Sequence, residues 1–550
     1  MMRRLFVMVA VLHGLLSAAA ADLAEQRMLS MAVSQLQAMG IDARVEKKAE
    51  TAAYAVYGTA AGGFVVLGKY ADGSRVLGYS TSVYHPDRLP CGLRWWLDAL
   101  DKLEVGQLPV PAAQRYNAVE NFVGTQWGQD VPFNQKCPLQ DNKRTPTGCI
   151  ATAMAQVMRY YQWPDAGQGM GSYTVGTDTD HPVYEAVDGS YQWGNMPLVQ
   201  YSFATRAAIR NAVSTLLYDC GKASKMNYNL EGSGAMDYDQ ALALARNFQY
   251  DSLAMWRCER SLYGDDEWMQ LINAEMQARR PVLYSGASEQ DGGHAFLLSG
   301  LDATGKVYVN WGWYGDCDGY YDIKALKPVD DEQEVYDFTS SQTMTIGIQP
   351  LSSEGSVGQL RSQWVSFFVA DAGVSRNLRQ LEIPYYYFYN VQYLPFVGAV
   401  GLLFESTDGK GISRMLTVDG MEGETVFCYE GYTNVDYSGS QPTYNPVSIS
   451  LSGFSAGSYR ATWVTKAGQE SEPRRIVDEE GAPLPPFYVT KAAGGFLSVQ
   501  HSADPSGIAG VTASPADTPR YYDLQGRAVD ATHPGLTIVR HGAETVVVSQ

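Results

Sequence analysis

The sequence predicts an α+β protein that is divided into several units along its 550 residues. Between residues 118 and 350, segments with helical periodicity come first and segments with strand-like alternation follow, an order typical of α+β domains. Residues 22–117 combine alternating segments with one amphipathic helix, which predicts a small α+β unit. From 355 to 500, short strands and turns dominate, which predicts a β-sandwich. A chain of this length exceeds what one hydrophobic core supports.

Within the first unit, an antiparallel meander is expected to precede a helix that contains Trp95 and Trp96. Val105–Asn117 is rich in Gly, Pro, Ala and Gln and has no periodicity, which predicts a linker open to proteolysis. The expected strands are residues 54–57, 63–67 and 75–79, and the expected helix is 93–103.

The central unit changes character at Pro281, where helical spacing gives way to strands. Its expected helices are Cys149–Gln162, Thr205–Tyr218, Tyr238–Phe248 and Asp266–Arg279. Its expected strands are Val282–Tyr284, His294–Ser299, Val307–Trp311, Tyr320–Ile323 and Thr343–Ile348.

The first 21 residues have the pattern of an export signal. Arg3 and Arg4 precede the apolar run Leu5–Leu12, and small residues follow up to Ala21. This run is too short to anchor the chain in a membrane, and no later stretch approaches the length of a membrane span. We therefore expect a secreted or cell-surface protein without a transmembrane segment.

Charge and cysteine content exclude further classes of protein. The formal net charge of −18 argues against nucleic acid as a partner, because phosphates require clusters of Lys and Arg. The seven cysteines are scattered and odd in number, with no C-x-x-C pair, so neither a zinc site nor a disulfide framework is expected. At least one thiol stays unpaired. No metal or organic cofactor is expected.

Cys149 is the candidate nucleophile. It follows the turn Pro146-Thr147-Gly148 and begins an apolar-periodic helix. A thiol in the first turn of a helix lies beside unpaired N–H groups and the positive end of the dipole, which favour the reactive thiolate. A buried structural cysteine is the alternative, and the helix start alone does not decide between the two.

A nucleophilic cysteine needs a base, and the central unit contains two histidines. His181 lies in an acidic turn and is expected to be solvated. His294 follows two glycines, precedes a predicted buried strand and lies 145 residues after Cys149, the spacing found in papain-type enzymes. A histidine packed in the core is the alternative. His294 is therefore the candidate base.

Three further residues could complete the site. Asn310 lies on the next predicted strand, where its carbonyl could orient the imidazole. Trp311 could shield that hydrogen bond from water. Gln129 precedes Cys149 by 20 residues, and its amide, with the Cys149 N–H, could stabilise an oxyanion.

These segments resemble the active-site blocks of the streptopain (C10) family of cysteine peptidases. They read, in family order, W-G-Q-D-V-P-F-N, T-G-C-I-A-T-A-M-A-Q, G-G-H-A-F and V-N-W-G-W. The resemblance implies a papain-like fold for residues 118–350, with Cys149 as nucleophile, His294 as base, Asn310 orienting it, Gln129 in the oxyanion hole and Trp311 shielding the site. Papain's own C-G-S-C-W signature is absent.

The flanking units also resemble known segments. Residues 22–117, with G-G-F-V-V-L and L-R-W-W-L, are similar to the family's propeptide, which implies a zymogen that is inhibited by its own prodomain and removes it autocatalytically. In residues 510–550, Tyr522-Asp-Leu-Gln-Gly-Arg527 followed by Pro-Gly-Leu-Thr-Ile-Val539 is similar to a C-terminal sorting segment, which implies a secretion machinery as partner. An ordinary hairpin is the alternative. The predicted function is a secreted cysteine endopeptidase that cleaves polypeptide substrates.

Four other interpretations were weighed. Gly453-Phe-Ser-Ala-Gly457 matches the G-x-S-x-G motif of serine hydrolases, but it falls among strands rather than in a strand–turn–helix elbow. Asp316-Cys-Asp-Gly319 is a poor calcium motif. Transglutaminase-like and amidase enzymes share the Cys-then-His order. The last alternative is a non-catalytic adhesin with a relic papain-like domain, against which the complete set of candidate residues argues.

Overall fold

The computed structural model describes most of the chain after residue 21. The predicted export signal lies outside the described residues, as does most of the predicted linker. The described residues are 22–102, 115–199, 201–202, 205–288, 292–323, 342–351, 363–408, 413–420, 425–439, 441–468, 472–501 and the strand segments 520–522, 528–529, 536–541 and 544–549.

The chain forms two compact units. The first contains Met1–Met255 and Gly264–Ser356, and the second contains Trp256–Tyr263 and Val357–Gln550. Residues 256–263, which the sequence assigns to the central domain, thus group with the C-terminal part of the chain.

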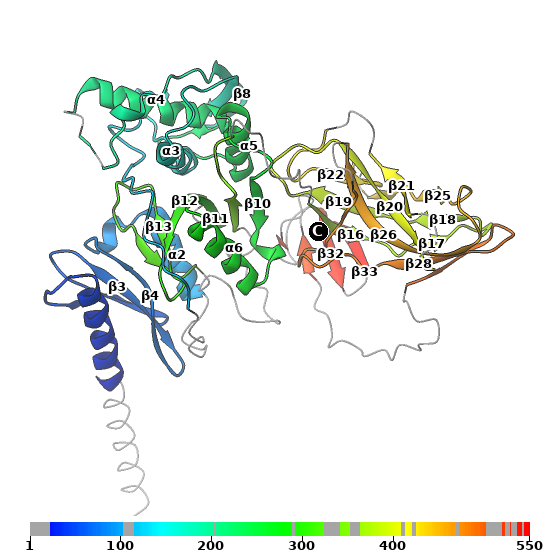
Figure 1. The fold of residues 1–550 in the computed structure, drawn as a ribbon, viewed down its shortest axis with the longest axis horizontal. Coiled ribbons are helices and arrows are strands. Elements are labelled where there is room, and N and C mark those ends of the chain that lie inside the picture. Colours follow the sequence, from blue (N-terminus) through cyan, green and yellow to red (C-terminus); the bar gives the residue numbers. More distant parts are fainter. Residues whose placement is uncertain are drawn as a thin grey trace, which may run out of the picture. The chain divides into compact units, whose positions relative to one another are not determined.

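The first unit is built around an antiparallel sheet in the order β1-β2-β3-β4-β14-β13-β12-β11-β15 (Figure 1). The predicted N-terminal meander does not stand alone, because β4 pairs with β14 through Gly78↔Tyr321, Tyr79↔Tyr320 and Ser80↔Gly319. The strands are β1 (Glu46–Glu50), β2 (Tyr54–Gly58), β3 (Phe64–Tyr70), β4 (Gly73–Ser80), β11 (Val282–Ser288), β12 (Gly292–Leu301), β13 (Val307–Asn310), β14 (Gly319–Tyr321) and β15 (Thr343–Ile346).

A helix over residues 22–38 covers the meander, and the sequence analysis did not single it out. Met28, Ala32 and Leu36 recur every four residues and therefore lie on one face of this helix. They form a small core with side chains of β2 and β3, Ala55 and Val65 among them. The spacing of these three residues is the signal that would have predicted the helix.

The predicted helices are confirmed, with ends that differ by a few residues. α4 continues five residues beyond its predicted end, and Cys220 and Gly221 in that extension are buried. The helices are α2 (Cys91–Lys102), α3 (Cys149–Tyr161), α4 (Ala207–Ala223), α5 (Asp237–Asn247) and α6 (Asp265–Gln277), with 3-10 turns η1 (Pro86–Arg88), η3 (Trp193–Asn195) and η4 (Arg260–Leu262). The minor strands are β5 (Leu139–Gln140), β6 (Lys143–Arg144), β7 (Met170–Val175), β8 (Asp178–Ala186), β9 (Asn227–Tyr228) and β10 (Trp256–Glu259).

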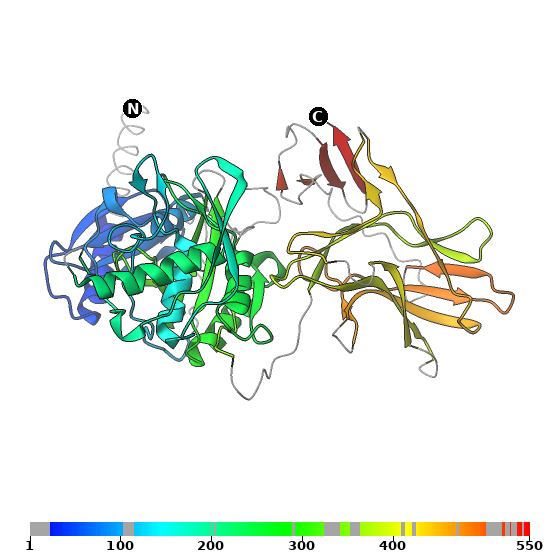
Figure 2. The same cartoon turned by 90° about the horizontal axis from the view of Figure 1, so that it is seen from above.

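The second unit is rich in β-structure, as predicted (Figure 2). Side chains from several of its sheets share one core, in which Trp364 stacks on Tyr432 with ring centroids 5.3 Å apart. The strands are β16 (Trp364–Val369), β17 (Gly373–Val374), β18 (Gln380–Ile383), β19 (Tyr386–Asn390), β20 (Gly398–Ser406), β21 (Ser413–Asp419), β22 (Gly431–Thr433), β23 (Val435–Asp436), β24 (Thr443–Tyr444), β25 (Val447–Ser450), β26 (Gly457–Ala467), β27 (Arg474–Arg475), β28 (Phe487–Lys491), β29 (Leu497–Gln500), β30 (Arg520–Tyr522), β31 (Ala528–Val529), β32 (Leu536–His541) and β33 (Glu544–Ser549).

The G-x-S-x-G segment and the sorting-like tail both lie in the second unit. The last glycine of G-x-S-x-G is the first residue of β26, and the segment before it is a turn, so the helix of a nucleophile elbow does not follow. β30 to β33 form a four-stranded sheet in the order β31-β30-β32-β33 within the sorting-like tail. Among the described residues, no helix combines the length and hydropathy needed to cross a bilayer.

Candidate active site

Cys149 is the first residue of α3, and the residue before it has to be glycine. Gly148 has a φ of 86°, a left-handed conformation that favours glycine. A Cβ at this position would come within 2.8 Å of the Met226 side chain and 3.0 Å of the Ser233 carbonyl oxygen. The first turn is held by Thr152, whose N–H and hydroxyl both donate to the Gly148 carbonyl, at 3.1 and 2.9 Å. The Gly-Cys pair therefore fixes where the thiol begins the helix.

The surroundings of the Cys149 sulfur act on its pKa in opposite directions. Burial raises the pKa of the thiol above its ordinary value, while the N–H groups of Ala295, Ile150 and Cys149 itself lower it. The residue as a whole keeps part of its surface exposed. Burial is the larger of these influences, and the backbone N–H groups around the sulfur are the ones that favour a thiolate.

Gln129 is attached to the segment that leads into α3. Gln129 is buried, and its backbone carbonyl oxygen accepts a hydrogen bond of 2.9 Å from the N–H of Thr147, two residues before Cys149. Asn134, from the same loop, donates to the Thr145 carbonyl at 3.0 Å. Two bonds thus tie the glutamine loop to the turn before the nucleophile.

His294 lies next to the residue that touches the Cys149 sulfur. β13 ends at Asn310, opposite Leu297 of β12, so that Ala295 lies beyond the last pair of these two strands. The Ala295 N–H, in this strand segment, acts on the sulfur and lowers the pKa of the thiol. One face of β12 also packs against α3. The backbone of the candidate base is thus one residue away from the candidate nucleophile.

Asn310 belongs to a closed network of amides on the α3 side of the sheet. Its Nδ2 donates to the Thr125 carbonyl at 2.6 Å and to Gln156 Oε1 at 3.0 Å. Its Oδ1 accepts from Gln156 Nε2 at 3.2 Å and from the Gly312 N–H at 2.9 Å. Asn310 and Gln156 are both buried. Both lone pairs of Oδ1 are in use, so an imidazole could bond there only by displacing one donor.

The His294 side chain extends on the other face of β12. His294 is paired with Gly286 of β11 without any register shift, and paired residues share a face. A Cβ at Gly286 would point into the ring of Trp95, 2.5 Å away. Phe296 lies on this same face, with ring centroids 6.3 Å from Trp95 and 5.0 Å from Trp311. This is the face that α2 covers.

The N-terminal end of α2 lies against Trp311. A Cβ at Gly92 would come within 2.6 Å of Cε3 of the Trp311 ring. Further along the helix, Trp96 donates from Nε1 to the Asp322 carbonyl at 3.2 Å and meets Tyr321 edge-on at 5.1 Å. The N-terminal region thus covers the Trp311 side of the site with tightly fitted aromatic contacts.

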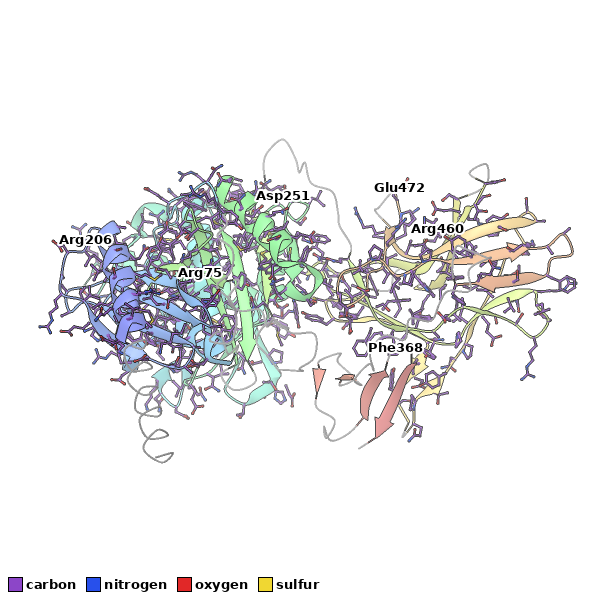
Figure 3. The ribbon with its side chains drawn as sticks, turned by 90° about the horizontal axis from the view of Figure 1, so that it is seen from below. Arg75, Arg206, Asp251, Phe368, Arg460 and Glu472 are labelled. Carbon is purple, nitrogen blue, oxygen red and sulfur yellow. The ribbon has the colours of Figure 1, made fainter. Side chains whose placement is uncertain are left out.

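Side-chain hydrogen bonds and an ion pair join the N-terminal meander to the β13–β14 region of the sheet. Arg75 of β4, which is labelled in Figure 3, forms an ion pair of 2.9 Å with Asp322. Tyr79 donates to Asp302 at 3.0 Å. Ser80 donates to the carbonyl of Asp318 at 2.6 Å. The N-terminal region is therefore held by both polar and apolar contacts.

Two buried residues of the site were missed from sequence. Gln156 follows Cys149 by seven residues on the same helical face, and a glutamine buried in an apolar helix is the signal that could have found it. Asp318 was weighed only as a calcium ligand. Its Oδ1 accepts from the Trp311 N–H at 2.9 Å, and no cluster of three metal-ligating side chains exists among the described residues. His181 is exposed and bonds to Asp178 at 2.8 Å, which confirms the solvated interpretation.

Comparison with known proteins points to one family. The model of the Peptidase C10 family matches residues 127–321, a range that contains Gln129, Cys149, His294, Asn310 and Trp311. A solved fragment of prointerpain A from Prevotella intermedia, a cysteine-to-alanine mutant, is 32% identical with a TM-score of 0.50. This alignment covers 56% of the present chain and 100% of the fragment.

Two curated proteins are also similar. The thiol protease/hemagglutinin PrtT of Porphyromonas gingivalis is 34% identical over 234 residues, which are 42% of this chain. The chain spans only 26% of the length of PrtT. Streptopain of Streptococcus pyogenes is 27% identical over 323 residues, covering 54% of this chain and 80% of streptopain.

Proposed function

The chain belongs to the peptidase C10 family of cysteine peptidases, and we propose that it is an endopeptidase precursor with Cys149 as nucleophile and His294 as general base. The observation that carries the proposal is that the Ala295 N–H lies close enough to the Cys149 sulfur to lower the pKa of its thiol. It brings the backbone beside His294 to the thiol, although α3 and β12 are more than 130 residues apart in sequence. We further propose that the chain is exported and that its tail engages a secretion machinery.

The proposed reaction uses side chains and one backbone N–H of the chain, together with water. The Cys149 thiolate attacks the peptide carbonyl, and the oxyanion that forms accepts hydrogen bonds from the Gln129 amide and the Cys149 N–H. His294 protonates the leaving amine and then takes a proton from the water that hydrolyses the acyl-enzyme. Asn310 orients the imidazole and Trp311 covers it.

In this proposal the described form is the zymogen. His294 shares a face with Trp95 and Trp311, while Asn310 is engaged on the other face by Gln156 and Gly312. Cleavage after α2 and release of residues 22–117 would uncover the His294 face. The imidazole then turns toward the sulfur, and Asn310 exchanges one of its two donors for the ring N–H. The prodomain thus acts as the chain's own inhibitor.

The test uses the chain without residues 1–21, as wild type, Cys149→Ala and His294→Ala. Wild type should shorten by the length of the prodomain and hydrolyse casein, and an epoxide thiol-protease inhibitor should stop both. Each variant should lose about 10³-fold or more in casein hydrolysis, because each removes one partner of a unit that acts together. Electrophoresis over time and release of labelled casein fragments give both readouts.

Two results would contradict the proposal. If Cys149→Ala matured and cut casein at the rate of wild type, the nucleophile would be another residue. If wild type neither matured nor hydrolysed any polypeptide under reducing conditions, the chain would be a binding protein of the adhesin type with an inactive peptidase domain.

A further inference from the structure

The segment that follows β13 runs beside the loop that contains Gln129. Asn310, where β13 ends, donates from Nδ2 to the Thr125 carbonyl at 2.6 Å. Two further hydrogen bonds between these two segments involve Tyr314, four residues after Asn310. The loop of the candidate oxyanion donor is therefore joined to the segment that carries the candidate orienting residue.

Tyr314 contacts the residues on both sides of Gln129. Its backbone N–H donates to the Trp127 carbonyl at 3.1 Å. Its ring lies against Gly128, where a Cβ would come within 2.4 Å of the ring carbons Cε1 and Cζ. Its hydroxyl oxygen accepts a hydrogen bond of 3.0 Å from the Asp130 N–H. One residue thus holds the backbone before and after Gln129.

Gln129 itself is tied to the turn before the nucleophile. Its backbone carbonyl accepts from the Thr147 N–H at 2.9 Å, and the residue is buried. The placement of Gln129 relative to Cys149 therefore depends on Thr147 and on Tyr314. A hydrogen-bond donor stabilises an oxyanion only if it is in place before the charge develops, to within about 0.5 Å.

The backbone of Tyr314 is in a conformation that a tyrosine rarely adopts. Its φ is 59°, in the left-handed region, which glycine would occupy at lower cost. Strained residues of this kind persist where the surrounding contacts hold them, and they cluster at functional sites. The turn would accept glycine, so the tyrosine adds the contacts of its ring and hydroxyl to the Gln129 loop.

We propose that Tyr314 is a positioning residue for Gln129, which it holds at the oxyanion site without touching the substrate itself. The inference rests on the proposed function, in which the Gln129 amide supplies the donor. Tyr314 and the Gln129 loop both follow the predicted linker, so their contacts belong to the mature enzyme as well as to the precursor.

The ring and the hydroxyl of Tyr314 have to be tested separately. The ring also packs against Phe133, with centroids 5.7 Å apart, so that its removal lowers stability as well. The hydroxyl contacts the Asp130 N–H, and Tyr314→Phe removes that bond while the ring stays. Tyr314→Phe is therefore the informative variant.

The experiment uses the mature enzyme as wild type, Tyr314→Phe, Gln129→Ala and the double variant. Each precursor is matured with resin-bound wild-type enzyme, which is then removed. Tyr160→Phe is the matched control, because it also loses one hydroxyl hydrogen bond of 3.0 Å to a backbone group, the Arg279 carbonyl. The measurements are kcat and KM on a fluorogenic peptide, inhibition by a peptide aldehyde and the rate of alkylation by iodoacetamide.

The two reagents separate positioning from a merely structural role. The aldehyde forms a hemithioacetal whose oxygen occupies the oxyanion site, whereas alkylation by iodoacetamide develops no oxyanion. Tyr314→Phe should lower kcat about three- to tenfold with KM close to wild type, and weaken the aldehyde by a similar factor. Its alkylation rate should stay at the wild-type value, and Tyr160→Phe should match wild type in every measurement.

The double variant tests whether Tyr314 acts through Gln129. Gln129→Ala should lower kcat about 10²- to 10³-fold, and adding Tyr314→Phe should then cause little further loss. An equal loss from Tyr314→Phe in both backgrounds, or unchanged kcat and aldehyde inhibition in Tyr314→Phe, would overturn the positioning role alone. Inactive wild type, or full activity in Gln129→Ala, would instead contradict the proposed function, and this inference with it.

Discussion

The two faces of the sheet at β12 and β13 are held in different ways. On the α3 face, Asn310, Gln156 and the Thr125 carbonyl form a network of hydrogen bonds within the central domain. On the α2 face, Trp95 from the N-terminal region packs against Phe296, and Gly92 of the same helix fits against Trp311.

In the proposed zymogen, these two kinds of contact let the site be ordered and still be uncovered later. A buried amide network is stable only when every member has a partner, so it has to be complete in each form of the protein. Apolar burial is non-directional and is lost when the covering element leaves. Around Asn310, the hydrogen bonds thus join residues that remain after the proposed activation, whereas the apolar cover belongs to the segment proposed to be removed.

The largest expected effect is on the apolar face. Trp95 is 1% exposed, and Trp95→Ala should lower the free energy of unfolding of the precursor by about 3–5 kcal/mol, the usual cost of emptying such a site. The reason is the loss of ring contacts with Phe296 and Gly286. Thermal or urea unfolding in a Cys149→Ala background measures the stability without self-cleavage, and the otherwise wild-type variant should mature faster.

Asp101→Ala is the matched control, because Asp101 lies on the same helix and is exposed. It should leave both stability and maturation rate close to wild type. If Trp95→Ala matured no faster than Asp101→Ala, α2 would not be the cover that limits access to the site.

A smaller effect is expected on the polar face. Gln156→Leu removes one donor to Asn310 and one acceptor from it, at a cost of about 1–3 kcal/mol. Asn310 would keep Thr125 and Gly312 as partners but lose its fixed orientation. We therefore expect lower stability of the precursor together with a lower kcat of the mature enzyme, measured on a short fluorogenic peptide.

Gln156→Glu sharpens this test. The carboxylate can still accept from Asn310 Nδ2 but cannot donate to Oδ1. If the amide pair positions Asn310, activity should fall less in Gln156→Glu than in Gln156→Leu. Unchanged kcat in both, with only stability reduced, would make the pair a structural element without influence on the reaction.

Sequence predicted the elements of the site better than their arrangement. The Gly-Cys helix start needed only local chemistry, and α3 was predicted within one residue at its end. Which way His294 points depends on its pairing with Gly286 and on Trp95, which is about 200 residues away in the chain. Such a register comes from long-range packing and cannot be deduced from one strand's own pattern.

The segment 256–263 illustrates the same limit. It lies between two helices of the central domain but groups with the second unit. Arg257 is buried there and donates to Glu259 at 2.7 Å and to the Tyr429 hydroxyl at 2.6 Å. The residues next to Arg257 in sequence do not indicate that it is buried, because its partner Tyr429 lies 172 residues further along the chain.

The last prediction concerns the pH dependence of stability and the buried residue Asp318, which accepts a hydrogen bond from the Trp311 N–H. Burial raises the pKa of Asp318 to about 8, although the Trp311 N–H bound to its carboxyl acts to lower it. The folded chain therefore holds a proton at pH values where the unfolded chain, with a pKa of about 3.9, has lost it. Stability from this group is greatest at low pH and declines as the pH rises toward and through about 8.

Asp318→Asn should flatten that decline, because the amide is neutral at every pH and its oxygen can still accept from Trp311. The free energy of unfolding of the Cys149→Ala precursor should fall from about pH 6 to about pH 9, and fall less steeply in the double variant. Asp42→Asn, at an exposed residue that does not act on the pKa of Asp318, is the control and should keep the steeper slope. Equal slopes in all three proteins would mean that the Asp318 carboxyl is ionised when folded. The hydrogen bond from the Trp311 N–H would then be accepted by a charged carboxylate rather than by a neutral carboxyl group.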